Sequence, residues 1–162
     1  PSALPAYHTI LQALLQKEIP ILTPSPDTDI HFSDGLLLDI IWPPRAIHKK
    51  WQKGTNNSSV VLRAIYGHQS ALLTGDIEEK AEMAILASGA DIRTTILKVA
   101  HHGSTTSTST GFLLEGAPRA AVISVGRNNS YQHPHPSIVS RLLRSGTTVT
   151  TTAQNGTIME EF

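Results

Sequence analysis

The feature that most constrains the fold is a short apolar run, residues 96–99, that leads into two adjacent histidines, His101 and His102. A short apolar run bounded by polar residues is typical of a buried strand, and the loop that follows such a strand often presents ligand-binding side chains. A second apolar run, residues 70–74, leads in the same way into Asp76. Together the two segments predict one half of a metal site. A capped turn and a helix N-cap remain the alternative explanation of each segment taken alone.

A third apolar run, residues 118–125, leads into a segment with two histidines that are each followed by proline, His133 and His135. Loops at the carboxyl ends of neighbouring strands can converge on one crevice. A carboxylate and several imidazoles are suitable ligands for zinc or manganese. A metal held there activates water and polarises a phosphoryl or carbonyl oxygen. The three strand ends together predict a metallohydrolase site.

The rest of the chain alternates between predicted strands and helices. Apolar residues at helical spacing predict helices at residues 7–19, 78–88, 111–115 and 138–144. Apolar runs between turn residues predict strands at 21–23, 29–32, 36–42, 60–66, 70–74, 91–99, 118–125, 147–152 and 156–160. Hairpins come first and β–α alternation follows, which predicts an α/β fold with mixed sheets. We find no repeat or linker and expect residues 1–162 to form a single domain.

The composition excludes several classes of protein. The 162-residue chain contains no cysteine, so it has no disulfide partner, no thiolate nucleophile and no cysteine zinc site. Thirteen basic and thirteen acidic residues balance, which excludes the overall positive charge of a typical nucleic-acid binder. No apolar run reaches the roughly 20 residues that span a bilayer. Lysines and a tryptophan in residues 45–57 are compatible with a nucleic-acid platform, but we interpret this stretch as a solvated loop.

Three motifs resemble the metallo-β-lactamase-like domain of the ComEC competence proteins. They lie at residues 72–78, 97–104 and 129–136, in the order found in that family, and residues 56–60 add to the match. The resemblance implies a portion of an αββα sandwich with mixed or antiparallel sheets. It also implies a metal-dependent hydrolase, a phosphodiesterase or nuclease that acts on DNA during DNA uptake. Two alternatives are a hydrolase of small phosphoesters of the phosphocholine type and a degenerate, non-catalytic module.

The resemblance also assigns roles to individual residues. Asp76 matches a metal ligand, and His101 and His102 match a motif that supplies at least one more, for which we prefer His102. His133 and His135 match groups that stabilise charge or act as general acid. The positions that contact substrate or support the site are Asn56, Ser59, Gly103, Ser104, Asn129 and Tyr131.

Two departures from the family pattern stand out. Gln132 occupies a position where the family usually has glycine. Family members also carry a His-x-Asp-x-Asp-His motif shortly before a segment like residues 4–6, and residues 1–7 contain no equivalent. We therefore expect the chain to start downstream of this first metal motif. By itself it should bind zinc or manganese weakly or not at all, and it should be inactive.

The resemblance finally implies a cellular setting. The parent protein is expected in the bacterial cytoplasmic membrane, with this domain soluble and on the extracytoplasmic side. The expected partners are DNA and the membrane channel portion of the same parent protein.

Overall fold

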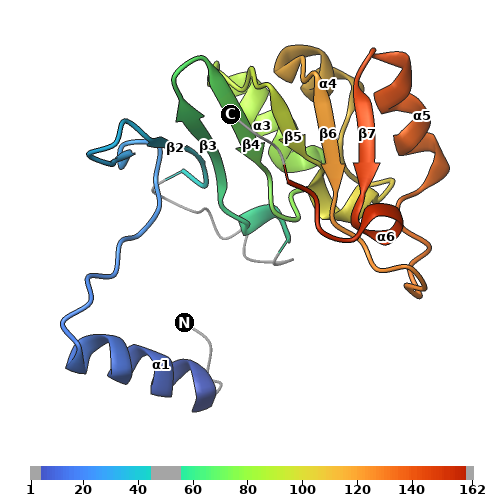
Figure 1. The fold of residues 1–162 in the computed structure, drawn as a ribbon. Helices are drawn as coiled ribbons and strands as arrows, with labels where there is room; N and C mark the ends of the chain where they lie inside the picture. Colours follow the sequence, from blue (N-terminus) through green and yellow to red (C-terminus); the bar gives the residue numbers. More distant parts are fainter. Residues whose placement is uncertain (1–4, 45–55, 160–162) are drawn as a thin grey trace.

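A computed structural model describes residues 5–44 and 56–159, which contain one seven-stranded sheet (Figure 1). The strands lie side by side in chain order: β1 Ile30–His31, β2 Leu37–Trp42, β3 Val61–Tyr66, β4 Gln69–Leu73, β5 Ile96–Lys98, β6 Ala120–Ile123 and β7 Thr148–Thr151. The α-helices are α1 Pro5–Gln16, α3 Glu79–Ser88, α4 Thr110–Gly116, α5 Pro136–Arg144 and α6 Thr152–Asn155. Two 3₁₀ turns, η1 Asn56–Ser58 and η2 Ala100–Gly103, precede β3 and follow β5.

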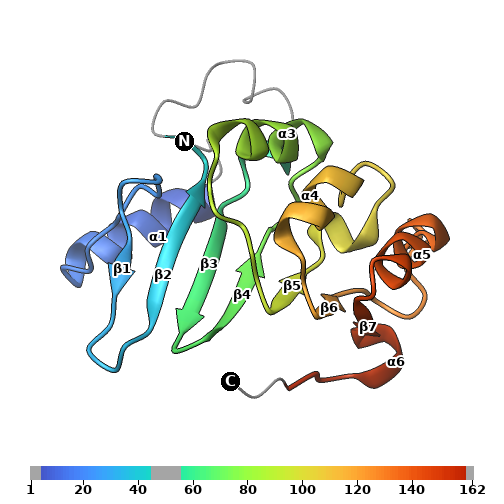
Figure 2. The ribbon, with the colours of Figure 1, turned by 90° about the horizontal axis from the view of Figure 1, so that it is seen from above.

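The sheet is mixed, as the sequence predicts. Strands β1 to β4 pair antiparallel, with short turns between β1 and β2 and between β3 and β4, and β4 to β7 pair parallel. Gly35 and Gly67 have φ angles of +93° and +57° in the two hairpin turns, a region that glycine enters without steric cost. Each parallel pair needs a crossover, which α3, α4 and α5 supply in turn. Because parallel crossovers are right-handed and the strand order advances in one direction, all three helices cover the same face (Figure 2).

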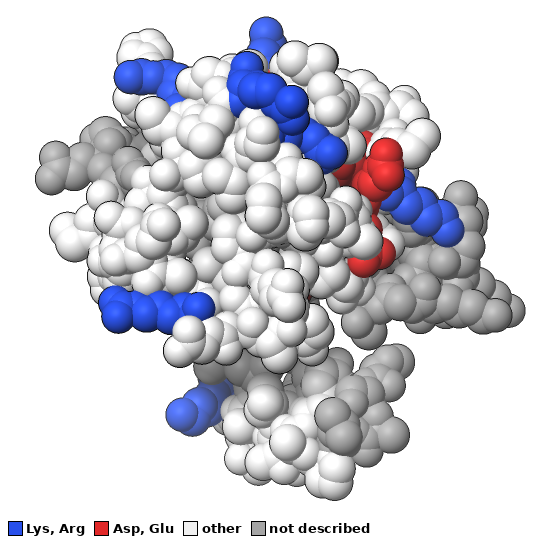
Figure 3. All heavy atoms as spheres, turned by 90° about the vertical axis from the view of Figure 1, so that its right-hand side faces the viewer, with Lys and Arg blue, Asp and Glu red and all other residues white. Residues whose placement is uncertain are grey.

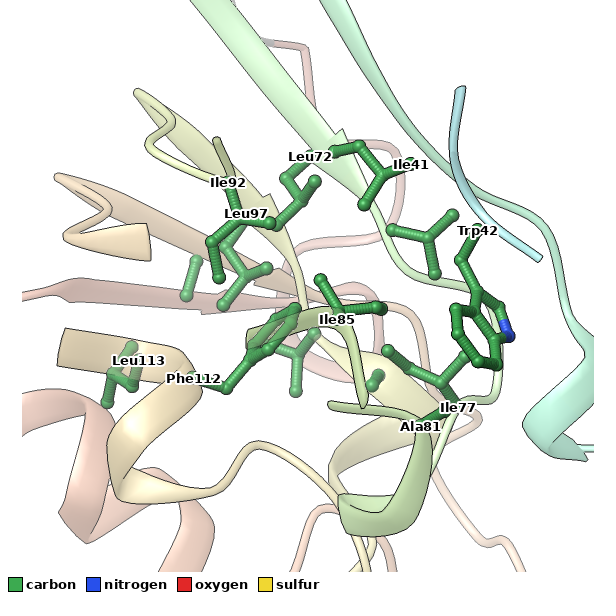
Figure 4. Close-up of a cluster of buried hydrophobic side chains, with 14 of the residues drawn as sticks. Ile41, Trp42, Leu72, Ile77, Ala81, Ile85, Ile92, Leu97, Phe112 and Leu113 are labelled. Carbon is green, nitrogen blue, oxygen red and sulfur yellow. The ribbon is translucent and has the colours of Figure 1, made fainter. Parts of the chain in front are cut away.

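The hydrophobic core lies between this helical layer and the sheet (Figure 4). Leu72 and Leu97, from adjacent strands β4 and β5, are 0% and 2% exposed. Ile85 of α3 and Phe112 of α4 pack against this cluster, and both are buried. Trp42 closes the β2 end, where its indole Nε1 donates a hydrogen bond to the carbonyl oxygen of Asn57 at 2.8 Å. The core therefore fixes the strands whose carboxyl ends lead into the predicted site.

Helices α3, α4 and α5 leave the opposite face of the sheet uncovered, and of the described helices only the short α6 lies on that side, beside β7 (Figure 2). Cross-strand pairing places Leu62, Leu73, Lys98 and Val122 in one row on this face. Leu73 is 41% exposed. Helix α1 stands apart from the sheet and has no buried residue (Figure 1). The described residues thus form one sheet and one helical layer, and the full sandwich is not among them.

Two predicted strands are wrong. Residues 21–23 have no regular structure, and Ile21 and Leu22 are exposed because no strand pairs with them. Residues 156–159 form no strand either, since α6 follows β7 directly. The predicted strand 91–99 shrinks to β5 because Thr94 and Thr95 instead bond to Ser70 at the edge of β4. Most of the basic stretch, residues 45–55, lies outside the described residues.

Two adjacent leucines of α4 offer a matched test of this core. Leu113 is 3% exposed and Leu114 is 69% exposed. We expect Leu113→Ala to lower the free energy of unfolding by about 2–5 kcal/mol, because it leaves a cavity. Leu114→Ala should change it by less than about 0.5 kcal/mol, since leucine and alanine have similar helix propensities. Urea denaturation followed by circular dichroism measures both. Equal losses would contradict the assigned face of α4.

Candidate functional site

The loops after β4 and β5 meet because these strands are parallel neighbours. The backbone N–H of His101 donates to the carbonyl oxygen of Gly75 at 3.1 Å. Gly75 has φ of +56°, and a Cβ at this position would lie 2.7 Å from the Cβ of Ser59. Ser59 Oγ accepts a hydrogen bond from the backbone N–H of Asp76 at 3.2 Å. Ser59, one of the predicted supporting residues, therefore holds the loop that carries Asp76.

Asp76 and His102 face each other across this junction. His102 Nδ1 lies 2.7 Å from the carbonyl oxygen of Ser124, at the end of β6. A carbonyl oxygen only accepts hydrogen bonds, so Nδ1 carries a proton, and in the neutral tautomer Nε2 keeps its lone pair. Nε2 lies 3.5 Å from Asp76 Oδ1, and both side chains are half-exposed. The tautomer of His102 is thus fixed by the backbone, with an open acceptor beside a carboxylate.

This geometry fits two ligands of one metal ion. Metal-binding histidines commonly donate the other ring N–H to a backbone carbonyl, as His102 does. Ligand bonds of about 2.0–2.2 Å in a tetrahedral site place two ligand atoms roughly 3.3–3.6 Å apart. The Asp76–His102 distance of 3.5 Å agrees with that spacing. Within residues 5–44 and 56–159, no group of three or more histidine, aspartate or glutamate residues is placed to hold a metal ion.

His101 has different surroundings from its neighbour. Its Nε2 lies 3.4 Å from Asn56 Nδ2. Its Nδ1 lies 3.4 Å from Thr106 Oγ1 and 3.7 Å from Glu78 Oε1. Both ring nitrogens therefore have protein partners, and the carboxylate nearest to His101 belongs to Glu78.

The histidine loop is strained and is held from both sides. His101 and His102 have φ angles of +48° and +56°, a region that costs roughly 1–2 kcal/mol for each residue with a Cβ. Gly103 follows with φ of +81°, and a Cβ there would lie 2.7 Å from the Cβ of Pro134. The backbone N–H of His135 donates to the carbonyl oxygen of Gly103 at 2.9 Å. Gly103 therefore allows the third loop to approach the first two closely.

The third loop brings His133 against His101. Their ring centroids are 5.9 Å apart in an edge-to-face arrangement. The exposed ring of Tyr131 stacks on His133, with the ring centroids 5.8 Å apart. Asn129 clamps the backbone of His133, since its amide donates to the carbonyl oxygen and its side-chain oxygen accepts from the N–H. Gln132 has φ of +56°, the region in which glycine is favoured.

The imidazole of His133 has an unusual environment. Its Nδ1 is buried and has no hydrogen-bond partner in the described structure. Burial lowers the pKa of His133, and the neighbouring histidines His101, His102 and His135 lower it further. The neutral form is therefore favoured, with one unused ring nitrogen at the rim of the site.

The two predicted catalytic histidines separate in the structure. The exposed residue His135 is the N-cap of α5, where its Nδ1 accepts from the backbone N–H of Ser137 at 3.3 Å. Ring contacts and charge effects place His133 with the histidine cluster. The catalytic roles of both residues stay predictions.

Sequence reasoning missed Glu78, Thr106 and Asn57, which surround His101. In the sequence Glu78 ends the motif at residues 72–78 and begins a predicted helix, and Thr106 is one of many hydroxyl residues in the loop after Gly103. Only the folded chain shows that Asn57 Nδ2 donates to Glu78 Oε2 at 3.0 Å and that Thr106 Oγ1 donates to Glu78 Oε1 at 3.3 Å. Ser104, which the sequence did single out, lies 3.1 Å from Thr106 through their hydroxyl oxygens.

Two glycines provide a matched test of the loop contact. Gly103→Ala should lower the free energy of unfolding by about 1–3 kcal/mol, because alanine is strained at positive φ and its Cβ meets Pro134. Gly126→Ala is the control, since its φ is not in that region and no atom lies within 4 Å of its Cβ position. The control should leave stability unchanged or raise it by up to about 1 kcal/mol. Chemical denaturation of both variants gives the comparison. A neutral Gly103→Ala would show that the two loops do not touch.

A buried carboxylate below the site gives a pH test. Glu82 is 0% exposed and accepts hydrogen bonds from the backbone N–H groups of Thr108 and Ser109. Burial raises its pKa, so the folded state holds the proton more tightly than the unfolded state. Its contribution to stability should therefore fall as pH rises from about 4.5 through the raised pKa. Urea denaturation across this range should show a steeper fall for the natural protein than for Glu82→Gln. Parallel curves would contradict the shift.

Three relatives of known name match this chain. It is 42% identical to ComE operon protein 3 of Bacillus subtilis over 66% of its length. It is 38% identical to Recombination protein 2 of Haemophilus influenzae over 79% of its length, and 35% identical to Competence protein ComA of Neisseria gonorrhoeae over 64%. No protein-family model matches the chain.

The match covers a small part of each relative, because the chain spans only 14 to 16% of their length. The matched stretch covers most of the chain in all three comparisons. None of the helices in the described part of the chain is long and apolar enough to cross a membrane. The chain is homologous to one region of the ComEC, ComA and Rec2 group of competence proteins.

Proposed function

We propose that this chain is part of a metal-dependent phosphodiesterase or nuclease domain that acts on DNA during competence-related DNA uptake. The observation that carries the proposal is the pair formed by Asp76 and His102, in which a backbone carbonyl fixes the histidine tautomer and leaves two ligand atoms 3.5 Å apart. The relationship to a protein named for competence supports the biological setting.

Asp76 and His102 would hold a zinc or manganese ion. When bound, such an ion lowers the pKa of water and polarises a phosphoryl oxygen. His133 and the exposed Tyr131 would form the opposite wall, with His133 in the predicted role of general acid or charge stabiliser. The amide of Asn56, next to His101, is a further contact for a phosphate oxygen.

The chain forms one half of the proposed domain. A sheet with helices on one face and an apolar opposite face is one α/β half of an αββα sandwich. Further chain in the parent protein would cover the row of Leu62, Leu73 and Val122 and supply the remaining metal ligands. The proposed parent is a cytoplasmic membrane protein that carries this domain on the extracytoplasmic side, next to its channel portion.

A second candidate function is the hydrolysis of small phosphoesters. The net charge of zero favours it, because DNA-binding surfaces are usually positive. On the side of the molecule that carries α5, basic side chains are scattered, an acidic group lies among them, and most of the surface is uncharged (Figure 3). A non-catalytic module is the third candidate, since Asp76 and His102 alone are too few ligands for an ordinary zinc site.

The test compares variants in a longer natural chain, that of the parent protein proposed above. Asp76→Asn and His102→Gln should each lower manganese-dependent hydrolysis by at least about 100-fold, because each removes a ligand. Asp27→Asn, at an exposed position in a turn before β1, is the control and should retain full activity. Plasmid DNA and bis(p-nitrophenyl) phosphate are the two substrates.

Each outcome separates the candidate functions. Cleavage of DNA supports the nuclease. Cleavage of the small ester with intact DNA transfers the assignment to the second candidate, and no cleavage of either with zinc or manganese leaves the non-catalytic module. Calorimetric titration of the 162-residue chain alone should show no tight zinc site. A nanomolar affinity would show that this chain already holds the full set of ligands.

A further inference from the structure

Glu78 lies where four segments of the chain meet. Its Oε2 accepts from Asn57 Nδ2 of η1 at 3.0 Å, and its Oε1 accepts from Thr106 Oγ1 in the loop after η2 at 3.3 Å. Its backbone N–H donates to Asn57 Oδ1 at 3.0 Å. Although Glu78 is the N-cap residue of α3, its side chain makes no capping bond. The carboxylate therefore serves neighbouring segments rather than its own helix.

The hydrogen bonds around Glu78 fix the proton positions on His101. Thr106 Oγ1 lies 3.1 Å from Ser104 Oγ and 3.3 Å from Glu78 Oε1. A carboxylate only accepts, so we assign the single hydroxyl proton of Thr106 to Glu78, with Ser104 donating to Thr106. Thr106 Oγ1 must then accept from His101 Nδ1, 3.4 Å away. With its proton on Nδ1, neutral His101 has a lone pair on Nε2, which accepts from the Asn56 amide at 3.4 Å. The chain Asn56 to His101 to Thr106 to Glu78 has one consistent direction.

This direction contrasts with the arrangement at His102. There the lone pair of Nε2 faces the Asp76 carboxylate, another acceptor, across 3.5 Å. At His101 the lone pair of Nε2 faces an amide donor. A metal ligand needs a free lone pair, so only His102 has the geometry of a ligand. His101 instead orients Asn56, whose amide has a second N–H for an anionic oxygen.

We propose that Glu78 is a positioning residue, which acts through Thr106 to hold His101 in the Nδ1–H tautomer and thereby directs the Asn56 amide toward the substrate phosphate. This inference rests on the proposed phosphoesterase function and assigns different roles in it to the two adjacent histidines. His102 belongs to the metal side of the site, and His101 belongs to the substrate side. The ring centroid of His101 also lies 5.9 Å from that of His133. By holding the His101 ring, the Glu78 carboxylate therefore stabilises this ring contact as well.

The first test reads the tautomer directly and needs no activity. Long-range ¹H–¹⁵N spectra at pH 8.5, above the usual imidazole pKa of about 6.5, should show His101 protonated at Nδ1. Glu78→Gln and Thr106→Val should give a mixture of tautomers, because each breaks the relay. Thr106→Ser keeps the hydroxyl and should keep the Nδ1–H form. Glu79→Gln, one residue further along in α3, is the matched control and should match the natural protein.

The second test uses the longer natural chain and the small phosphoester. Glu78→Gln and Thr106→Val should lower kcat/KM by about 10-fold and leave manganese affinity unchanged, whereas Thr106→Ser and Glu79→Gln retain both. If Glu78→Gln weakens metal binding as much as His102→Gln does, Glu78 supports the metal and the proposal is overturned. Unchanged tautomers in Glu78→Gln and Thr106→Val would overturn it as well.

The two tests separate this inference from the proposed function. Thr106 is exposed, so Thr106→Val reports on the relay even if Glu78→Gln impairs folding. If the longer natural chain hydrolyses no phosphoester while the tautomers change as expected, the relay stands and the hydrolase assignment fails. If it hydrolyses the ester and all four variants behave alike, the hydrolase assignment stands and the relay fails.

Discussion

The site depends on the parallel pairing of β4 with β5, which the buried pair Leu72 and Leu97 secures. Parallel neighbours end at the same edge of a sheet, so the loops after them emerge side by side. This pairing brings Asp76 within 3.5 Å of His102, although a complete helix separates them in the chain. Strand β6 is the next parallel neighbour, and the carbonyl of Ser124 at its end orients His102. Three adjacent strand ends thus bring Asp76 and His102 together and orient them.

The loops approach each other closely because two positions are glycine, and the same turn contains two histidines with strained backbone angles. Gly75 and Gly103 occupy positions where a Cβ would lie 2.7 Å from Ser59 and Pro134. His101 and His102 adopt left-handed backbone angles in the same turn. Strain of this kind persists only when surrounding contacts fix it, and here backbone hydrogen bonds to both neighbouring loops do so. The strain gives the two imidazoles separate directions, one toward Asp76 and one toward Glu78.

The uncovered face of the sheet and the incomplete ligand set of the proposed site have the same explanation. The row of Leu62, Leu73, Lys98 and Val122 includes the partly exposed Leu73, and the described residues contain no group of three or more potential ligands placed to hold a metal ion. A parent domain with a second layer would cover the row and complete the site together. The small share of the relatives' length that this chain spans is compatible with such a parent.

The sequence alone determined the elements with strong local signals. Apolar runs marked β2 to β6, helical spacing marked α3 and α5, and the residues after the strands marked Asp76 and His102. Tertiary structure decided what depends on distant partners. Residues 21–23 lack a strand because nothing pairs with them, and the His102 tautomer depends on a carbonyl from another strand. Glu78 ends the motif at residues 72–78, but the sequence does not show that Asn57, Thr106 and His101 gather around its carboxylate, because these residues lie far apart in the chain.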